Sequence, residues 1–311
     1  MAERVNVQVD GRQLSLSNLD KVLYPRAGFT KGEVIDYYTR IAPVLLPHLA
    51  DRPLTIKRYP NGVDAPFFFE KNAARGTPKW VRTVTLPVPG STMNREKIDF
   101  IVAEELATLV WLANLAALEL HTPQWRTPEA GSRKRKPRTD LIVFDLDPGP
   151  PADITQCCEV ALRLRDILEA DGLTARPKTS GSKGLQVSAA IETADPEAPS
   201  RYAQSVARHL ESEHPKLIVS RMAKNLRRGK VFVDWSQNNA AKTTVAPYSL
   251  RAREQPAVST PVSWDEVADS NPLTFTASHV LRRIDELGDL FAPTLDDSVR
   301  SRLPSSHAAA G

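Results

Sequence analysis

The stretch Leu141 to Pro151, LIVFDLDPGPP, places two carboxylates, Asp145 and Asp147, at the end of an apolar run. A continuous apolar run closed by Pro-Gly is typical of a buried strand that ends in a turn. Side chains alternate along a strand, so both carboxylates should project from the same face. Two such charges repel each other unless a cation lies between them. Taken alone, the stretch fits either a cation site or an Asp-x-Asp that only caps the turn or the next helix.

A second apolar strand also ends in an acid and decides between these interpretations. It reads Val231-Phe232-Val233-Asp234. Three carboxylates at strand ends commonly hold two divalent cations against a triphosphate. Asp145, Asp147 and Asp234 are therefore the candidate catalytic and metal-binding residues.

Composition indicates a globular chain of 311 residues, with 41% hydrophobic and 25% charged residues. No run approaches the roughly 18 apolar residues of a membrane helix, and the N-terminus MAERVNVQVDG lacks a signal-peptide core, so we expect a cytoplasmic protein without a membrane partner. A net charge of +4 weakly favours a polyanionic partner. The neighbouring Cys157 and Cys158 suggest ordinary thiols, because no other Cys or His completes a metal set near them.

The periodicities predict both helices and strands. Thr30 should cap a helix whose apolar face includes Ile35, Tyr38, Ile41 and Leu45. Further helices are expected at 101–117, 153–170, 200–213 and 277–287, and strands at 54–59, 118–122 and 173–179. The segment 83–94 indicates a strand, a turn and an exposed loop.

Lys21 and Lys31 flank a loop beside the start of the first helix. They are either solvated lysines or, because helix N-termini suit anions, the ligands of a terminal phosphate. The basic run Ser132 to Arg138, SRKRKPR, is typical of a solvated loop, although its charge would also raise affinity for DNA.

Three aromatic residues, Phe67 to Phe69, follow a turn and cannot all face one core, so at least one should be exposed. They represent either local packing or a platform on which bases stack, worth ~1–3 kcal/mol per base. The basic neighbours Lys57, Arg58 and Lys71 favour the platform.

Several residues beyond the carboxylates suit phosphate binding. His121 at a strand end is a candidate phosphate donor, and the compact turn Ser180 to Gly184 offers backbone donors and Lys183. This turn lacks the order of a Walker A loop. The arginines on both sides of Asp234, among them Arg227 and Arg251, can fork onto phosphates.

With these residues in view, the chain closely resembles the polymerase domain of bacterial end-joining DNA ligases (ligase D), a branch of the archaeo-eukaryotic primase superfamily. The mycobacterial and actinobacterial members, stand-alone primase-polymerases included, are the most similar. The resemblance runs through NLDKVLYP, RYPNGVDAPFFFEK, ALELHTPQW, FDLDPG, SGSKGL, VFVDWSQNN and KTTVAPYSLR.

The resemblance implies a mixed α/β (α+β) fold with an antiparallel-rich, primase-type catalytic sheet flanked by helices. It also implies a nucleotidyl transfer that uses two Mn²⁺ or Mg²⁺ ions. Asp145, Asp147 and Asp234 would bind these ions. The remaining implied roles divide between the incoming nucleotide (His121, Ser180, Lys183, Gln186, Arg227, Arg251, Lys57) and DNA (Asn18, Lys21, Lys31, Phe68, Phe69). The implied organisation is one primase-polymerase domain over 1–295, with DNA and 5′-phosphate contacts in 1–120 and the catalytic part in 121–295, followed by a polar tail, 296–311.

Two departures from the family pattern stand out. Members usually carry His where this chain has Gln186, and an uncharged amide implies weaker nucleotide binding or a shifted metal preference. The segment TVTLPVPGSTMNREK also differs from the family loop that organises DNA ends.

The expected function is a DNA-directed polymerase that fills short gaps or break ends bearing a 5′-phosphate, using rNTPs and dNTPs. No KxDG ligase motif occurs in the sequence, so the expected partners are a separate ATP-dependent DNA ligase and the end-binding protein Ku. Two rival hypotheses are an end-binding module that has lost catalysis, with Gln186 as the damaged position, and a metal-dependent nuclease or phosphohydrolase. Nucleotide incorporation, or DNA degradation without nucleotides, separates them.

Overall fold

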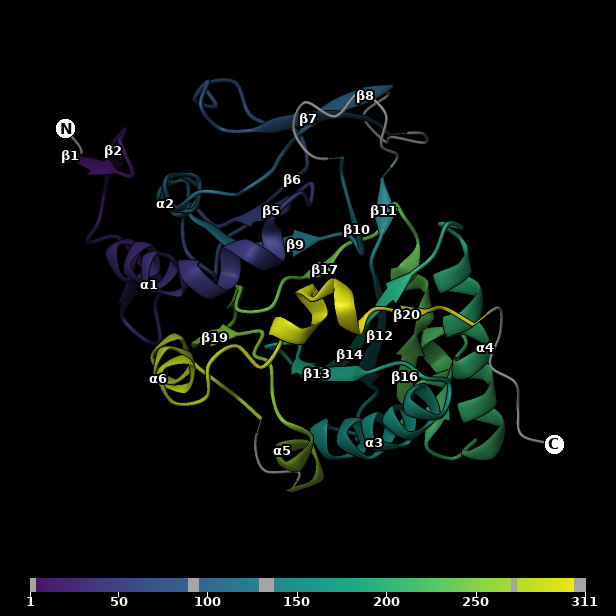
Figure 1. Ribbon diagram of the computed structural model, residues 1–311. Coiled ribbons are helices and arrows are strands. Elements are labelled where there is room, and N and C mark those ends of the chain that lie inside the picture. The colour runs from purple at the N-terminus through teal and green to yellow at the C-terminus, as the bar shows by residue number, and fades with distance from the viewer. Residues whose placement is uncertain (1–3, 89–94, 129–136, 270–272, 305–311) are drawn as a thin grey trace.

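The computed structural model describes residues 4–88, 95–128, 137–269 and 273–304 (Figure 1). The α-helices are α1 (Lys31–Leu49), α2 (Leu106–Asn114), α3 (Ile154–Ala170), α4 (Ala198–Glu213), α5 (Trp264–Asp269) and α6 (Ala277–Leu287). The strands in the first half are β1 (Arg4–Val9), β2 (Arg12–Ser17), β3 (Val22–Tyr24), β4 (Phe29–Thr30), β5 (Thr55–Arg58), β6 (Phe68–Glu70), β7 (Thr83–Pro87), β8 (Lys97–Ile101), β9 (Ala117–Thr122), β10 (Trp125–Arg126) and β11 (Arg138–Thr139). Those in the second half are β12 (Leu141–Pro148), β13 (Ala175–Thr179), β14 (Leu185–Glu192), β15 (Ile218–Val219), β16 (Val231–Asp234), β17 (Thr244–Val245), β18 (Leu250–Ala252), β19 (Pro256–Val258) and β20 (Ser301–Arg302).

The larger sheet has the order β13-β14-β12-β16-β15, and β20 pairs with β14. Neighbouring strands from β13 to β16 are antiparallel, whereas β15 runs parallel to β16. Ile142, Phe144 and Leu146 of β12 belong to a core shared with α3 and α4, so these helices cover that face. Because strand side chains alternate, Asp145 and Asp147 point away from the helices. Figure 1 shows α3 and α4 beside this sheet.

A second sheet has the order β17-β9-β5-β6 and belongs to another core. Helices α1 and α2 pack against each other there, and residues 246–250, 258, 277 and 280 return from the C-terminal half to join them. Phe275 packs against both cores. The sheet that carries the carboxylates and the sheet that carries His121 are thus parts of one continuous packing arrangement.

The helix starts follow the sequence signals. Thr30 caps α1 with a capping box completed by Glu33, and Asp153 caps α3 with Gln156 in the same way. The apolar face predicted for α1 is buried, and Cys157 and Cys158 are buried and form no disulfide. The mixed fold, the strands that end at the carboxylates and the helix 277–287 are confirmed.

One predicted helix is wrong at both ends. Residues 101–117 form α2 only from Leu106 to Asn114, because Ile101 ends β8, which pairs with β7, and Ala117 begins β9. An apolar run does not distinguish helix from buried strand, and here pairing with distant strands decides. The loop expected at 89–94, most of the basic run 132–138 and the tail from 305 onward lie outside the described residues.

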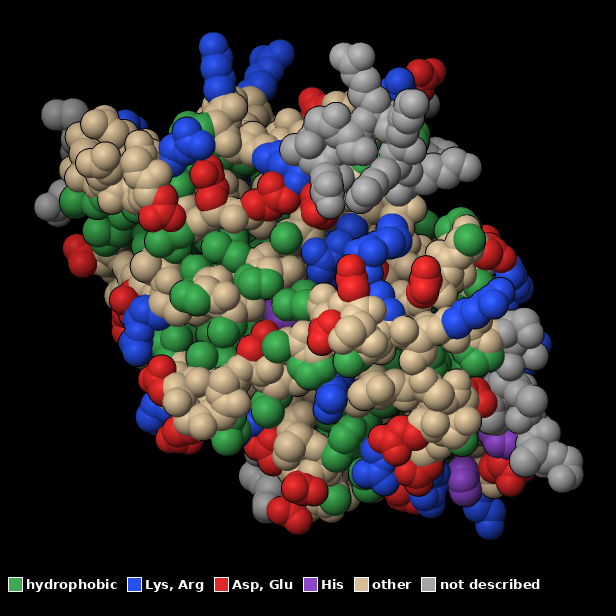
Figure 2. Space-filling model, in the orientation of Figure 1, with side chains coloured by type: hydrophobic (Ala, Val, Ile, Leu, Met, Phe, Trp, Pro, Cys, Tyr) green, Lys and Arg blue, Asp and Glu red, His purple; other side chains and the backbone are tan. Residues whose placement is uncertain are grey.

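Asp140, immediately before β12, is a buried carboxylate held by arginines from other segments. Arg52 and Arg126 contact its Oδ2 at 2.8 and 2.7 Å, and Arg300 lies 3.8 Å away. These charges hold the pKa of Asp140 low, although burial alone would raise it. Figure 2 shows Lys and Arg side chains gathered near β11, with acidic side chains beside them. No helix in the described ranges is long and apolar enough to span a membrane.

Candidate active site

The three carboxylates predicted from sequence lie together on two neighbouring strands. Asp145 of β12 is the direct cross-strand partner of Asp234 of β16, and Asp147 follows two residues further along β12. Residues paired in this way, and those two apart on a strand, point to the same face of a sheet. Asp145, Asp147 and Asp234 therefore share one face, the face opposite α3 and α4.

Burial and neighbouring carboxylates raise the proton affinity of Asp145 and of Asp147. Burial and the charge of Asp147 raise the pKa of Asp145 to about 7, and burial and the charge of Asp234 raise the pKa of Asp147. Asp145 Oδ1 accepts a hydrogen bond from Gln186 Nε2 at 3.0 Å, and Asp234 accepts from Ser236 and Gln237. The hydrogen bonds to Asp145 and Asp234 thus offset only part of the electrostatic repulsion among the three carboxylates.

This donor set fits divalent cations. In the ranges that the structure describes, no three His, Cys, Asp or Glu side chains converge closely enough to enclose an ion as they stand. Asp145 and Asp234 nevertheless keep acceptor capacity, because a carboxylate can accept at about four positions. Hard cations such as Mg²⁺ and Mn²⁺ prefer such oxygens, and their charge would favour the ionised carboxylates.

A second group of polar side chains lies on the other sheet around a buried acid, Glu119 of β9. His121 Nε2 lies 2.9 Å from this carboxylate, Lys57 Nζ 3.1 Å and Arg251 Nε 3.3 Å. Burial would raise the pKa of Glu119, but these three partners hold it well below its usual range. Burial lowers the pKa of His121 despite the attraction of Glu119. Glu119 therefore gathers three of the predicted nucleotide-binding side chains.

The turn Ser180 to Gly184 lies between these two groups. Ser180 Oγ accepts from the backbone N–H groups of Ser182 and Gly184, both at 3.2 Å, and Arg251 donates to Ser180 O at 2.5 Å. Lys183 is exposed. At Gly184 a Cβ atom would lie 2.0 Å from Leu146 O, between the two aspartates of β12. The turn is therefore packed directly against the strand that carries the carboxylates.

Arg227 lies on the other side of the carboxylates. Its guanidinium stacks 3.7 Å from the ring of Phe232, which pairs with Asp147 across the strands. A Cβ atom at position 149 would lie 1.9 Å from Arg227 O. Residue 149, in the turn after β12, must therefore be glycine, because only glycine lets the two backbones approach so closely. The sequence prediction that Arg227 and Arg251 flank the acidic site agrees with this geometry.

Asn18, Lys21 and Lys31 form a local unit at the start of α1. Asn18 has a left-handed backbone with φ of 54°, Lys21 N–H bonds to Asn18 O, and Lys31 N–H bonds to Lys21 O. Burial and the charge of Lys21 lower the pKa of Lys31 to about 8. Within the described ranges no carboxylate lies in salt-bridge range of either ammonium, although Lys31 donates to Ser17 O and Lys21 to Asn61. The unit suits an anion from outside.

The aromatic run is exposed, as the sequence indicated. Phe67, Phe68 and Phe69 are 49%, 55% and 55% exposed. Phe69 pairs with Lys57 and Phe68 with Arg58 on the edge strand β6, so the two rings point to opposite faces. Phe67 stacks on Tyr59, and Lys57 Nζ lies 5.5 Å from its ring centre. Phe68 and Phe69 would contact different parts of a nucleic acid.

Sequence reasoning missed two residues of this region, Glu119 and Lys178. Lys178 of β13 is 3% exposed and donates to Gln186 Oε1 at 2.5 Å. Burial lowers its pKa to about 7, against the attraction of Asp145. A lysine in a strand is ordinarily a surface residue, so only the sheet register could have found it.

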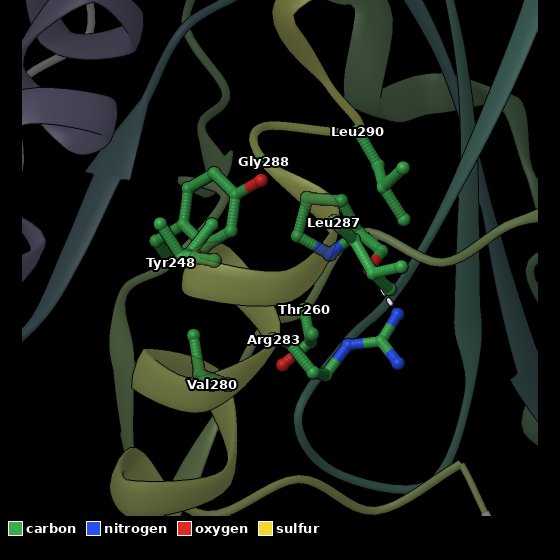
Figure 3. Close-up of a pocket in the computed structure, with 9 residues that line it drawn as sticks. Tyr248, Thr260, Val280, Arg283, Leu287, Gly288 and Leu290 are labelled. Atoms are coloured by element: carbon green, nitrogen blue, oxygen red, sulfur yellow. Dashed lines mark hydrogen bonds between the residues drawn. The ribbon is translucent and has the colours of Figure 1, made fainter.

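One small cavity lies away from the predicted site residues. A cavity of about 10 Å³ lies between α6 and the segment around Thr260, lined by Tyr248, Val280, Arg283 and Leu287 among others (Figure 3). It is too small for a nucleotide, and none of the predicted site residues lines it.

Comparison with known proteins places this arrangement in a family. A family model described as "LigD, primase-polymerase domain" matches residues 30–291. The chain belongs to the LigD primase-polymerase family. The resemblance expected from the sequence motifs is therefore confirmed, and the chain is a polymerase-type nucleotidyltransferase of a metal-dependent family.

Relatives and a solved structure agree with this assignment. The multifunctional non-homologous end joining protein LigD of Mycolicibacterium smegmatis is 46% identical over 282 residues, covering 90% of this chain and 36% of the relative. LigD of Mycobacterium tuberculosis is 44% identical over 301 residues, 94% of this chain and 39% of the relative. The chain thus spans well under half the length of these LigD proteins.

The solved structure described as the polymerase domain of Mycobacterium tuberculosis ligase D in complex with DNA matches with a TM-score of 0.86 and 43% identity, over 91% of this chain and 98% of that one. The fold of this LigD-family chain is therefore the archaeo-eukaryotic primase fold, as the resemblance implied.

Proposed function

We propose that this LigD-family chain is a DNA-directed polymerase that fills short gaps or break ends bearing a 5′-phosphate, with rNTPs or dNTPs, in DNA repair. The observation that carries the proposal is the register of Asp145 with Asp234, which brings three carboxylates onto one sheet face between two groups of basic side chains. Carboxylates flanked by cations suit a triphosphate and its counter-ions.

The carboxylates would hold two Mn²⁺ or Mg²⁺ ions, with Asp234 nearest the primer 3′-hydroxyl. Bound there, such ions lower the pKa of that hydroxyl and offset the charge of the triphosphate. The incoming nucleotide would be bound by the side chains around Glu119, by the Ser180–Gly184 turn and by the arginines beside the carboxylates. These nucleotide-binding residues are Lys57, His121, Ser180, Lys183, Gln186, Arg227 and Arg251.

DNA would be positioned by the start of α1 and by the aromatic strand β6. Asn18, Lys21 and Lys31 would hold the downstream 5′-phosphate, supported by two ammonium groups without a carboxylate partner in the described ranges. Phe68 and Phe69 would stack on the base and the template, in line with their opposite faces.

We further propose one primase-polymerase domain over 1–295, which the contact of Phe275 with both cores supports. Because β20 pairs with β14, the packed structure extends past residue 295 to Arg302. Because residues beyond 245 return to the first core, the division near residue 120 would separate DNA contacts from catalysis rather than two folding units. An ATP-dependent DNA ligase and Ku would be partners, in the bacterial cytoplasm at the nucleoid.

The decisive experiment is single-nucleotide incorporation into a gapped primer-template with Mn²⁺. We expect Asp145→Ala and Asp147→Ala each to abolish extension, while the control Asp285→Ala, an exposed acid on α6, keeps it. Extension by both carboxylate variants would overturn the metal assignment. Degradation of the DNA without nucleotides would instead support a nuclease.

A further inference from the structure

Lys178 is a buried cation at the end of a cross-strand row. The row consists of Lys178, Gln186, Asp145 and Asp234, which are paired in register on β13, β14, β12 and β16. Their side chains share one face of the sheet. Lys178 Nζ donates to Gln186 Oε1, and Gln186 Nε2 donates to Asp145 Oδ1 at 3.0 Å. The row therefore connects a buried ammonium to a metal-binding carboxylate through one amide.

Three oxygen atoms accept hydrogen bonds from Lys178 Nζ. They are Gln186 Oε1, Val245 O at 3.0 Å and Ser259 Oγ at 2.7 Å. The single hydroxyl hydrogen of Ser259 is already donated to Thr179 O at 2.8 Å. Three acceptors satisfy the three N–H groups of an ammonium, so this pocket is built for the protonated lysine.

This arrangement also fixes the direction of the Gln186 amide. If the amide were reversed, its NH₂ group would face the Lys178 ammonium and its oxygen would face the Asp145 carboxylate. Both contacts would then be repulsive. Lys178 therefore selects the orientation in which Gln186 donates to Asp145 and leaves one amide hydrogen for another acceptor. A buried hydrogen-bonded chain of this kind holds its members in one geometry.

Lys178 also joins the two sheets of the site. Val245, whose carbonyl accepts from Lys178, pairs with His121 on β9. The same ammonium thus touches the sheet that carries the carboxylates and the strand beside the predicted phosphate ligand.

We propose that Lys178 is a positioning residue, which acts through Gln186 to hold the Asp145 side chain oriented for the metal ions and fixes the spacing of the two sheets. This inference rests on the proposed metal site. Groups that hydrogen-bond to metal ligands typically change metal affinity roughly 10–100-fold when they are removed. Lys178 would act on the cations without contacting them or the nucleotide.

The test measures Mn²⁺ binding directly, by electron paramagnetic resonance of free Mn²⁺, in the full chain without nucleotide. We expect Lys178→Met to raise the Mn²⁺ dissociation constant about 10-fold or more. In gap filling, the Mn²⁺ concentration for half-maximal rate should rise in parallel. Binding of 5′-phosphorylated gapped DNA without metal should stay as in the wild type, because that contact lies at the start of α1.

Gln186→Leu provides an independent variant, because it removes the amide that joins Lys178 to Asp145 while leaving Lys178 in place. It should weaken Mn²⁺ binding to a similar degree, and it carries the test if Lys178→Met does not fold. The matched control is Arg52→Met, which removes another buried cation, 2% exposed and paired with Asp140. We expect it to lower the thermal midpoint without changing Mn²⁺ affinity.

Two results would overturn the inference: wild-type Mn²⁺ affinity in folded Lys178→Met, or an equal loss of affinity in Arg52→Met. In either case a wild-type chain that binds Mn²⁺ and fills gaps would leave the proposed function intact. A wild-type chain that binds no Mn²⁺ would instead overturn the metal site itself and the role of Lys178 with it.

Discussion

Substitution of Gly184 by alanine should strongly reduce the rate of catalysis while the protein stays folded. An added Cβ would lie 2.0 Å from Leu146 O and 3.2 Å from Leu146 C, both backbone atoms of β12. Carbon and oxygen atoms in close contact lie about 3.3–3.6 Å apart, so the turn or the strand must retreat by roughly 1.3 Å. Leu146 separates Asp145 from Asp147, and the displacement therefore falls between the carboxylates and the turn that would hold the phosphates.

The size of the effect follows from that displacement. Overpacking of this kind costs about 1–3 kcal/mol of stability. A misplacement of about 1 Å at a reacting centre can reduce the rate about 100-fold. We therefore expect kcat/KM for filling a single-nucleotide gap to fall about 100-fold in Gly184→Ala, with a folded protein at the assay temperature.

Gly172→Ala is the control for destabilisation alone. Gly172 has a φ of +78° with no atom within 4 Å of an added Cβ, so alanine there adds only backbone strain of about 1–2 kcal/mol. Gap filling, thermal unfolding and binding of gapped DNA are measured for both variants. A Gly184→Ala enzyme within about threefold of wild-type kcat/KM, or an equal loss in Gly172→Ala, would refute the reasoning.

Three further predictions address the nucleic-acid and nucleotide contacts. Phe69→Ala and Phe68→Ala should each weaken binding of gapped DNA by ~1–3 kcal/mol in fluorescence anisotropy, and unchanged affinity in both would exclude the platform. Because the pKa of Lys31 is lowered to about 8 and phosphate favours its protonated form, the preference for 5′-phosphorylated gaps should decline as the pH rises from about 7 to about 9. Lys31→Arg, which stays charged, should abolish that decline, and a decline that persists would assign it to another group. Glu119→Gln should raise the nucleotide KM in steady-state kinetics, because Lys57, His121 and Arg251 lose the charge that gathers them, and an unchanged KM would contradict this role.

Local signals in the sequence were sufficient for the helix starts and for the carboxylates. Thr30 and Asp153 carry capping boxes that can be recognised from residues three positions apart, and two aspartates two positions apart on a strand must point to the same face. The family motifs then supplied the reaction. Strand β8 was missed because its pairing with β7 depends on residues outside its own segment.

The interactions between strands could not be predicted in this way. That Asp145 faces Asp234 depends on a register between segments almost ninety residues apart in the chain. Likewise, the sequence shows Glu119 only as an acid in an apolar strand. Its significance depends on the sheet pairing, which places Lys57 of β5 and Arg251 beside it together with His121. Lys178 acquired significance only through its partners on β14 and β17.

The positions of β12 and β6 within their sheets imply different rigidity at the two ends of the site. β12 is flanked by β14 and β16, and Asp140 at its start is held by Arg52 and Arg126, so its amide hydrogens should exchange with solvent only on global opening. β6 is an edge strand with exposed side chains and can open locally. Under the proposed function, the strand that carries the carboxylates would stay fixed while the aromatic rings adapt to broken ends of differing shape. Tolerance of varied DNA ends and exactness of the chemistry would then belong to separate strands.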